Sequence, residues 1–277
     1  GKEFADLGFD VKDPTLGKNI DKIPPEELLK QDDTLQDQSH ITVVYLPKVA
    51  KKSEATLREV RRAKEKKHLV FGFTDKANSL PPEFEPYIDG WFTDFAELKE
   101  VLSIFIEPIG RYFTLAHTNN IEGDVLIYGA DISEVAPHHL HNLLKKSKSR
   151  KNIFHFCCET SHINDFAQKF PTILRLGKVE NIYVLTKDGT PHDIQMHTLT
   201  DEVVENQAFR GNVFHFVVEK GKLIEANLQA VKASRHLSQI MNLIGGNSAP
   251  KIMPSKDFLV AVFTGAKSDE GAIEESG

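Results

Sequence analysis

Residues 124–158 read DVLIYGADISEVAPHHLHNLLKKSKSRKNIFHFCC. Asp124–Tyr128 and Asn152–Cys158 are short runs of β-branched and aromatic residues, and each run predicts a strand. Ser133–Ser147, between them, has the apolar spacing of an amphipathic helix. A strand, a helix and a second strand in this order are typical of a β-α-β unit with parallel strands.

The same alternation continues on both sides of this stretch. Residues 191–210 show no clear pattern, and we expect most of residues 1–39 to be irregular. Further strands are predicted at Ile41–Leu46, Leu69–Thr74, Asn181–Leu185, Val213–Val218 and Phe258–Phe263, and further helices at Pro25–Lys30, Ser53–Lys67, Asp94–Ile106, Ile163–Leu174 and Leu223–Ile244. The sequence therefore predicts an α/β fold of mainly parallel sheets flanked by helices.

The chain length suits one large domain or two tandem domains of ordinary size, since the protein has 277 residues. We place a first α/β domain at residues 1–109, with an irregular N-terminal segment, and a second at residues 110–267. Residues 268–277 carry four acidic residues and no apolar core, and they predict a disordered acidic tail.

Charge and hydropathy restrict the kinds of partner. The net charge of −6 disfavours a general nucleic-acid binder, which needs clustered Lys and Arg. Basic runs at residues 48–67 and 145–151 lack interleaved aromatic residues, so we interpret them as solvated helix faces. No apolar run approaches the roughly 20 residues that cross a bilayer. We expect a cytoplasmic protein without a transmembrane segment.

Two strands look like copies, 60 residues apart: NIFHFCCE at Asn152–Glu159 and NVFHFVVE at Asn212–Glu219. A duplicated β-α-β unit and a chance likeness are both open explanations. Under a duplication, His155 and His215 would form a symmetric pair of ligands or bases. We favour the alternative that both are sheet residues flanked by aromatic side chains. The first of these strands contains Cys157 and Cys158, and we interpret both as reduced core residues.

Common catalytic and phosphate-binding motifs are missing from the sequence. It has no G-x-x-x-x-G-K-[ST] loop, no G-x-G-x-x-G after a strand and no G-x-S-x-G, so we expect no cofactor. Metal ligation has one weak candidate set, Glu134, His138 and His141, which are spaced to share one face of the predicted helix 133–147. A solvated polar face opposite the leucines of that helix is the competing interpretation.

Polar residues after the predicted strands are the strongest ligand-binding candidates. Ligands in open α/β sheets bind beyond the carboxyl ends of the strands. Asp131, Thr160 and Lys187 occupy three such positions, and they are the predicted ligand-binding residues.

The stretch Leu69–Ile106 resembles the second half of a receiver domain, the flavodoxin-like module of two-component signalling. Leu69–Thr74 resembles the fourth strand of that family, and Asp89–Thr93 resembles the fifth. Phe95–Leu98 is similar to the opening of its last helix. Near the start, Ala5–Val11 is similar to the family's first helix running into its second strand. The resemblance covers residues 2–107 and implies flavodoxin-like, receiver-like β-α-β units.

The receiver's functional positions hold other residue types here. Leu46 and Pro47 stand where the phospho-accepting Asp belongs, Asp94 takes the place of the essential Lys, and the first strand is missing. A weaker resemblance lies in Asp131, Thr160 and Lys187, which occur in the same order as the family's phospho-accepting Asp, its hydroxyl residue and its Lys. The resemblance therefore implies a degenerate receiver-like scaffold that takes no phosphoryl group.

Two functions compete at this point. One is a non-catalytic scaffold or adaptor that binds other proteins in a bacterial regulatory or secretion-type assembly, with a homodimer among the open oligomeric states. The alternative is an enzyme or small-ligand sensor with a pocket around Asp131, Thr160 and Lys187. The missing motifs favour the scaffold, and the positions of these three residues favour the ligand site.

Overall fold

The computed structural model describes most of the chain up to residue 233. The described residues are 2–12, 23–46, 54–74, 80–118, 121–147, 151–157, 161, 163–188 and 191–233. The chain divides into the units Gly1–Leu228 and Gln229–Gly277, and both sheets belong to the first unit. The predicted domain boundary at residues 109 and 110 falls between the two sheets, and it stays a prediction.

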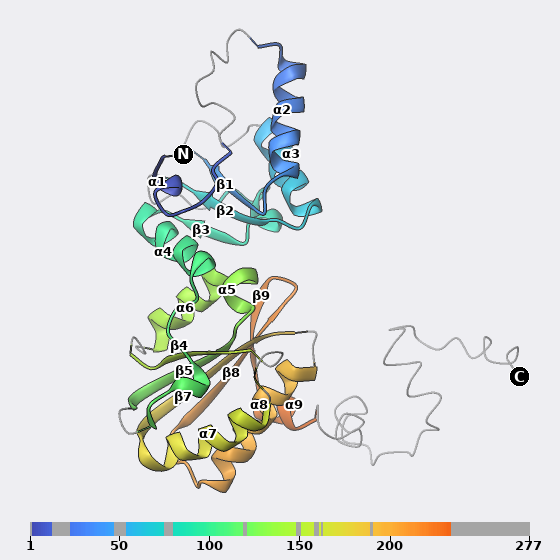
Figure 1. The fold of residues 1–277 in the computed structure, drawn as a ribbon. Helices are drawn as coiled ribbons and strands as arrows, with labels where there is room; N and C mark the ends of the chain where they lie inside the picture. Colours follow the sequence, from blue (N-terminus) through green and yellow to red (C-terminus); the bar gives the residue numbers. More distant parts are fainter. Residues whose placement is uncertain are drawn as a thin grey trace, which may run out of the picture. The chain divides into compact units, whose positions relative to one another are not determined.

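Nine strands are described (Figure 1). They are β1 (Ile41–Tyr45), β2 (Leu69–Phe73), β3 (Gly90–Phe92), β4 (Arg111–Tyr112), β5 (Glu122–Gly129), β6 (Ile153–Phe156), β7 (Lys178–Lys187), β8 (Asn212–Glu219) and β9 (Lys222–Ala226). β1, β2 and β3 form a three-stranded parallel sheet in that order. The others form a six-stranded sheet in the order β4-β6-β5-β7-β8-β9, in which only β9 is antiparallel to its neighbour. The predicted α/β fold with mainly parallel sheets is confirmed.

The described helices connect and cover these strands. They are α1 (Lys2–Ala5), α2 (Pro25–Asp37), α3 (Glu54–Glu65), α4 (Phe95–Ile106), α5 (Ile132–Val135), α6 (Pro137–Ser147), α7 (Ile163–Leu176), α8 (Pro191–Asn206) and α9 (Leu228–Ala233), with short 3-10 turns η3 (Glu85–Tyr87) and η4 (Phe113–Leu115). No helix in the described part of the chain has the length and apolar character needed to cross a membrane.

The smaller sheet is covered on both faces. Val60 and Ala63 of α3 pack with Val70 of β2, and Leu98 of α4 packs with Phe71 on the opposite face. This alternation along β2 is the period of two that a parallel strand buried on both sides requires. The side chain of Asp94 caps α4 by accepting a hydrogen bond from the backbone N–H of Ala96 at 2.9 Å.

The basic face of α3 lies against the acidic face of α2. Arg58 is 2.7 Å from Asp33, and Arg62 is 2.8 Å from Asp37. The prediction for α2 ended at Lys30, but the helix continues to Asp37. The extra turns carry the carboxylates that neutralise part of the basic run 48–67.

The larger sheet also has helices on both faces. Helices α7 and α8 cover one face, where Phe166, Phe170 and Met196 pack on Val125 and Val184 of the strands. α5, α6 and the end of α4 cover the other face. The apolar residues that these elements place there are Ile104, Ile132, Val135, Leu140 and Leu143. Each face thus has its own apolar core.

Two predicted helical regions differ from the structure. The helix predicted at 133–147 is two helices, because the chain leaves helical geometry at Ala136 and Pro137 begins α6. Residues 191–210, which gave no pattern, contain α8.

The helix predicted at 223–244 is wrong in its first residues, which form β9. Lys220 and Gly221 make the tight turn from β8 to β9, with φ of 49° and 78°. The short helix α9 falls within the predicted range, and residues 234–244 lie outside the described part of the chain.

The structure lacks features that the receiver resemblance and the repeated strand sequence suggested. No strand follows α1 within residues 2–12, where Ala5–Val11 had suggested one. β8 is followed by a hairpin, whereas β6 is followed by a helix, so the second copy does not open a β-α-β unit as the first copy does. The strand predicted at 258–263 and the tail at 268–277 lie outside the described residues.

Candidate functional site

The order of strands in the larger sheet reverses at β5. From β5 the chain passes through α5 and α6 to β6 on one side, and then through α7 to β7 on the other side. These helices lie on opposite faces of the sheet. The two connections therefore separate at the carboxyl ends of β5 and β7, and such a reversal is where open α/β sheets bind their ligands.

Two of the three predicted ligand-binding residues lie at this place. Lys187 is the last residue of β7, and Asp131 follows Gly129, the last residue of β5, by two positions. Tyr128 pairs with Leu185, so the neighbouring strands end at the same level of the sheet. Asp131 and Lys187 are both exposed. Thr160 lies outside the described residues.

Gly129 brings two carboxylates close to the strand end. A Cβ atom added at Gly129 would lie 3.0 Å from Oδ1 of Asp131 and 3.7 Å from Oδ1 of Asp193. Asp193 comes from the first turn of α8. Asp193 could not be predicted from the sequence, because residues 191–210 show no clear helical pattern. The carboxyl edge thus carries two carboxylates and the ammonium group of Lys187.

A buried line of polar side chains starts one residue before Lys187. Thr186 Oγ1 lies 2.9 Å from His197 Nε2, and His197 Nδ1 lies 3.0 Å from His215 Nδ1. All three side chains are buried. Burial lowers the pKa of His197 to about 3, with a smaller contribution from His215, and lowers the pKa of His215 to about 4. Both rings are therefore neutral near pH 7.

Only two proton arrangements satisfy this line. Either Thr186 donates to His197 and His197 donates to His215, or both hydrogen bonds run the other way. In both arrangements Nε2 of His215 is buried without a hydrogen-bond partner among the described residues. The residue types gave no signal of this contact, because it depends on which face of β8 meets α8.

The opposite face of the sheet carries a separate polar group. The hydroxyls of Tyr112 and Ser161 are hydrogen-bonded, and the ring of His155 lies 5.3 Å from that of Tyr112. Burial lowers the pKa of His155. His155 contacts Tyr112 and Tyr128, whereas His215 faces α8 and contacts His197. The two histidines therefore lie on opposite faces, and they do not form a symmetric pair.

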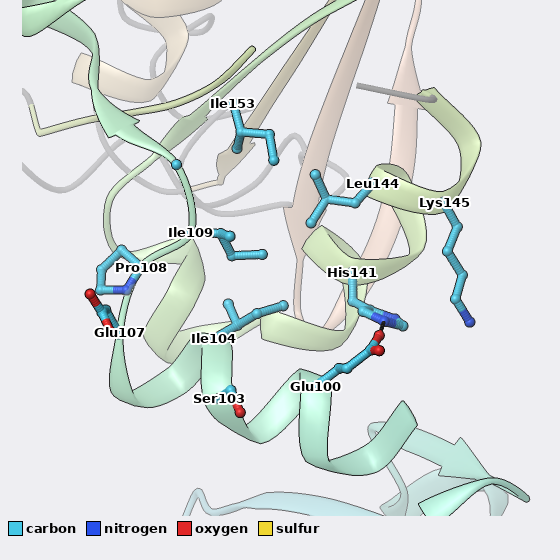
Figure 2. Close-up of a pocket in the computed structure, with 11 residues that line it drawn as sticks. Glu100, Ser103, Ile104, Glu107, Pro108, Ile109, His141, Leu144, Lys145 and Ile153 are labelled. Atoms are coloured by element: carbon cyan, nitrogen blue, oxygen red, sulfur yellow. Dashed lines mark hydrogen bonds and ion pairs between the residues drawn. The ribbon is translucent and has the colours of Figure 1, made fainter. Parts of the chain in front are cut away.

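A cavity of about 600 Å³ lies at the other end of β6 (Figure 2). Its wall is formed by α4, the segment 107–110, α6 and Ile153, the first residue of β6. Apolar side chains converge on the space, and Glu100 stands beside His141 with 2.9 Å between Oε2 and Nε2. This cavity is at the amino end of its strand, away from Asp131 and Lys187.

The weak metal candidate is not assembled. Glu134 belongs to α5, while His138 and His141 belong to α6, so the single helix that would align them is absent. His138 packs 5.6 Å from the ring of Phe71, and His141 binds Glu100. Among the residues that the structure describes, no three His, Cys, Asp or Glu side chains are grouped to hold a metal ion.

One comparison with known proteins gives a match. The model of a family described as a Rossmann-like domain matches residues 121–248. This range includes β5 to β9 and the residues Asp131 and Lys187, and it excludes residues 2–107, on which the receiver resemblance rests. No curated protein and no solved structure matches the chain. The match agrees with the α/β fold and with the central place of β5 in the larger sheet.

Proposed function

We propose that the chain binds a small polar ligand at the carboxyl edge of β5 and β7 and acts there as a sensor or an enzyme. The observation that carries the proposal is the position of Asp131 and Lys187 at the ends of adjacent strands, at the point where the strand order reverses. The Rossmann-like match over this part of the chain supports it.

The charges at this edge suggest the ligand chemistry. The ammonium group of Lys187 suits an anionic group such as a phosphate or carboxylate. Asp131 and Asp193 suit hydroxyl or amine donors, since ionised carboxylates only accept hydrogen bonds. Thr160 stays the third proposed contact. A ligand with an anionic group and several hydroxyls or an amine fits this set best, such as a nucleotide, a sugar phosphate or an amino acid.

Thermal shift measurements against these three ligand classes test the proposal. The informative variants are Lys187→Met and Asp131→Asn. The same strands supply matched controls at their other ends, Lys178→Met at the start of β7 and Glu122→Gln at the start of β5. We expect the first pair to weaken binding of a ligand at least about tenfold, as for a lost charge-assisted hydrogen bond, and the control pair to leave it unchanged.

Equal affinity in all four variants would exclude this edge as the binding site. NMR spectra of the ligand, recorded over hours in the presence of the protein, distinguish an enzyme from a sensor. An enzyme consumes the ligand, and a sensor leaves it intact.

The second candidate is the scaffold or adaptor in a bacterial regulatory or secretion-type assembly. The exposed strand β9 favours it. Among the described residues β9 pairs only with β8, and Ile224 in it is 43% exposed. An edge strand of this kind can accept a strand from a partner protein. This second proposal includes a degenerate receiver-like domain over residues 2–107. The parallel strand order β1-β2-β3 in that part of the chain is compatible with it.

Substitution in β9 tests the scaffold role. Ile224→Lys should reduce recovery of a specific partner from a cell lysate, while Leu176→Lys, at an exposed leucine of α7, should leave it unchanged. Recovery of the same proteins with both variants, or of none with the unchanged chain, would count against it.

A further inference from the structure

The open cavity between α4 and α6 is large enough to hold a small molecule. Its volume of about 600 Å³ lies within the usual range for such sites. Its apolar lining comes from four separate segments, whose side chains turn toward the space (Figure 2): Ile104, Ile109, Leu144 and Ile153. Gly110, with φ of 89°, lets the chain approach Ile153 closely, since an added Cβ atom would clash with the carbonyl oxygen of Ile153.

Two carboxylates and a hydroxyl group lie along one wall of the cavity. Glu100, Ser103 and Glu107 follow one another at intervals of three and four along α4 and its C-cap, and all three line the cavity. Glu100 binds His141, and the ammonium group of Lys145 binds Glu97 at 2.6 Å. The side chain of Glu107 has no hydrogen bond or ion pair with the described residues.

The local charge therefore favours a cation. The one ammonium group in the cavity wall, that of Lys145, already has a carboxylate partner, whereas the carboxylate of Glu107 has none among the described residues. An anionic ligand would meet two carboxylates, whereas a cationic ligand would gain a charge contact with Glu107. A cation with an apolar body would satisfy both the acidic rim and the apolar lining.

From this arrangement we propose that the cavity binds a small organic ammonium compound, with its apolar body against Ile104, Ile109, Leu144 and Ile153 and its ammonium group at Glu107. The site is separate from the carboxyl edge of β5 and β7, and it does not depend on the function proposed there.

Tryptamine is a suitable probe, because it joins a primary ammonium group to an apolar ring system. The neutral analogue 3-methylindole and the anion indole-3-acetate are its matched controls. NMR of isotope-labelled isoleucine methyl groups in the full chain reports the place of binding. Tryptamine should shift the methyl signals of Ile104, Ile109 and Ile153 and leave that of Ile182, in the core under α7 and α8, unchanged.

Three variants separate the contributions. Glu107→Gln should weaken tryptamine binding by about threefold or more, as expected for one solvent-exposed charge contact. Glu134→Gln, at an exposed carboxylate of α5, is the matched control and should have no effect. Leu144→Ala should remove one of the four apolar contacts and weaken tryptamine binding, with the Ile182 signal as the check that the fold is intact.

Two results would overturn the proposal. One is binding of indole-3-acetate as tightly as tryptamine. The other is a failure of tryptamine at millimolar concentration to shift the three cavity methyl signals in the unchanged chain.

Discussion

Replacing His138 with leucine should make the protein less sensitive to acid. Both ring nitrogens of His138 are buried without a hydrogen-bond partner among the described residues, and the ring lies against Phe71. Burial lowers the pKa of His138 to about 3, with smaller contributions from His139 and Lys64. In the unfolded chain the same ring has an ordinary pKa of about 6.5. The folded state therefore excludes a proton that the unfolded state accepts.

The sign and size of the effect follow from this difference. Stability is complete above about pH 6.5 and falls as the pH decreases toward 3, because only the unfolded chain takes up the proton in that range. At pH 5 each such histidine lowers the free energy of unfolding by roughly 2 kcal/mol. His197 and His215 act in the same direction, so the three together cost roughly 6 kcal/mol at pH 5. His138→Leu should remove about a third of that loss.

Urea denaturation at pH 7.5 and pH 5 measures this directly. Between the two pH values the variant should lose roughly 2 kcal/mol less of its free energy of unfolding than the unchanged protein. Leu140→Met, a buried substitution on the same helix, controls for repacking and should leave the pH dependence as it was. Equal losses of free energy of unfolding in His138→Leu and the unchanged protein between pH 7.5 and pH 5 would show that the buried ring of His138 does not resist protonation.

Three further substitutions test the packing. Phe113→Ala removes a fully buried ring whose centroid lies 4.7 Å from that of Phe166, and calorimetry should show that the free energy of unfolding falls by about 3–5 kcal/mol. Asp89→Ala removes the acceptor of hydrogen bonds from Lys64 and the backbone N–H of Val70, each 2.8 Å long, and urea denaturation should show a loss of about 2–4 kcal/mol. Gly110→Ala places a side chain on a residue with φ of 89° and against Ile153, so circular dichroism melting should show that the free energy of unfolding falls by at least about 1 kcal/mol. A smaller loss would contradict this geometry.

The sequence predicted the parts of the fold that its local patterns determine. The strands around Val125, Phe154 and Ile182 were found because continuous apolar runs are typical of parallel strands buried on both faces. Helix α8 was missed because its apolar residues follow no clear stripe. The residues of β9 fit a helical pattern because Leu223 and its neighbours have helical propensity, but pairing with β8 decides their conformation.

The candidate site was predictable only in part, for a similar reason. The positions of Asp131 and Lys187 after predicted strands were enough to place them at strand ends. The meeting of His197 with His215 depends on the position of α8 and on the orientation of β8, and no local pattern encodes either. The cavity likewise depends on the contact of α4 with α6. The contacting residues Glu100 and His141 are 41 positions apart in the sequence, so no local pattern predicts it.

The central claim is that a ligand binds at the carboxyl edge of β5 and β7. Backbone amide NMR of the full chain, titrated with a nucleotide, sugar phosphate or amino acid that raises its melting temperature, tests this most directly. The largest shifts should fall at Gly129–Asp131 and Thr186–Asp188, with none at Glu122 or Lys178 in the same strands. Shifts confined to the amino ends of these strands, or to residues outside the larger sheet, would contradict it.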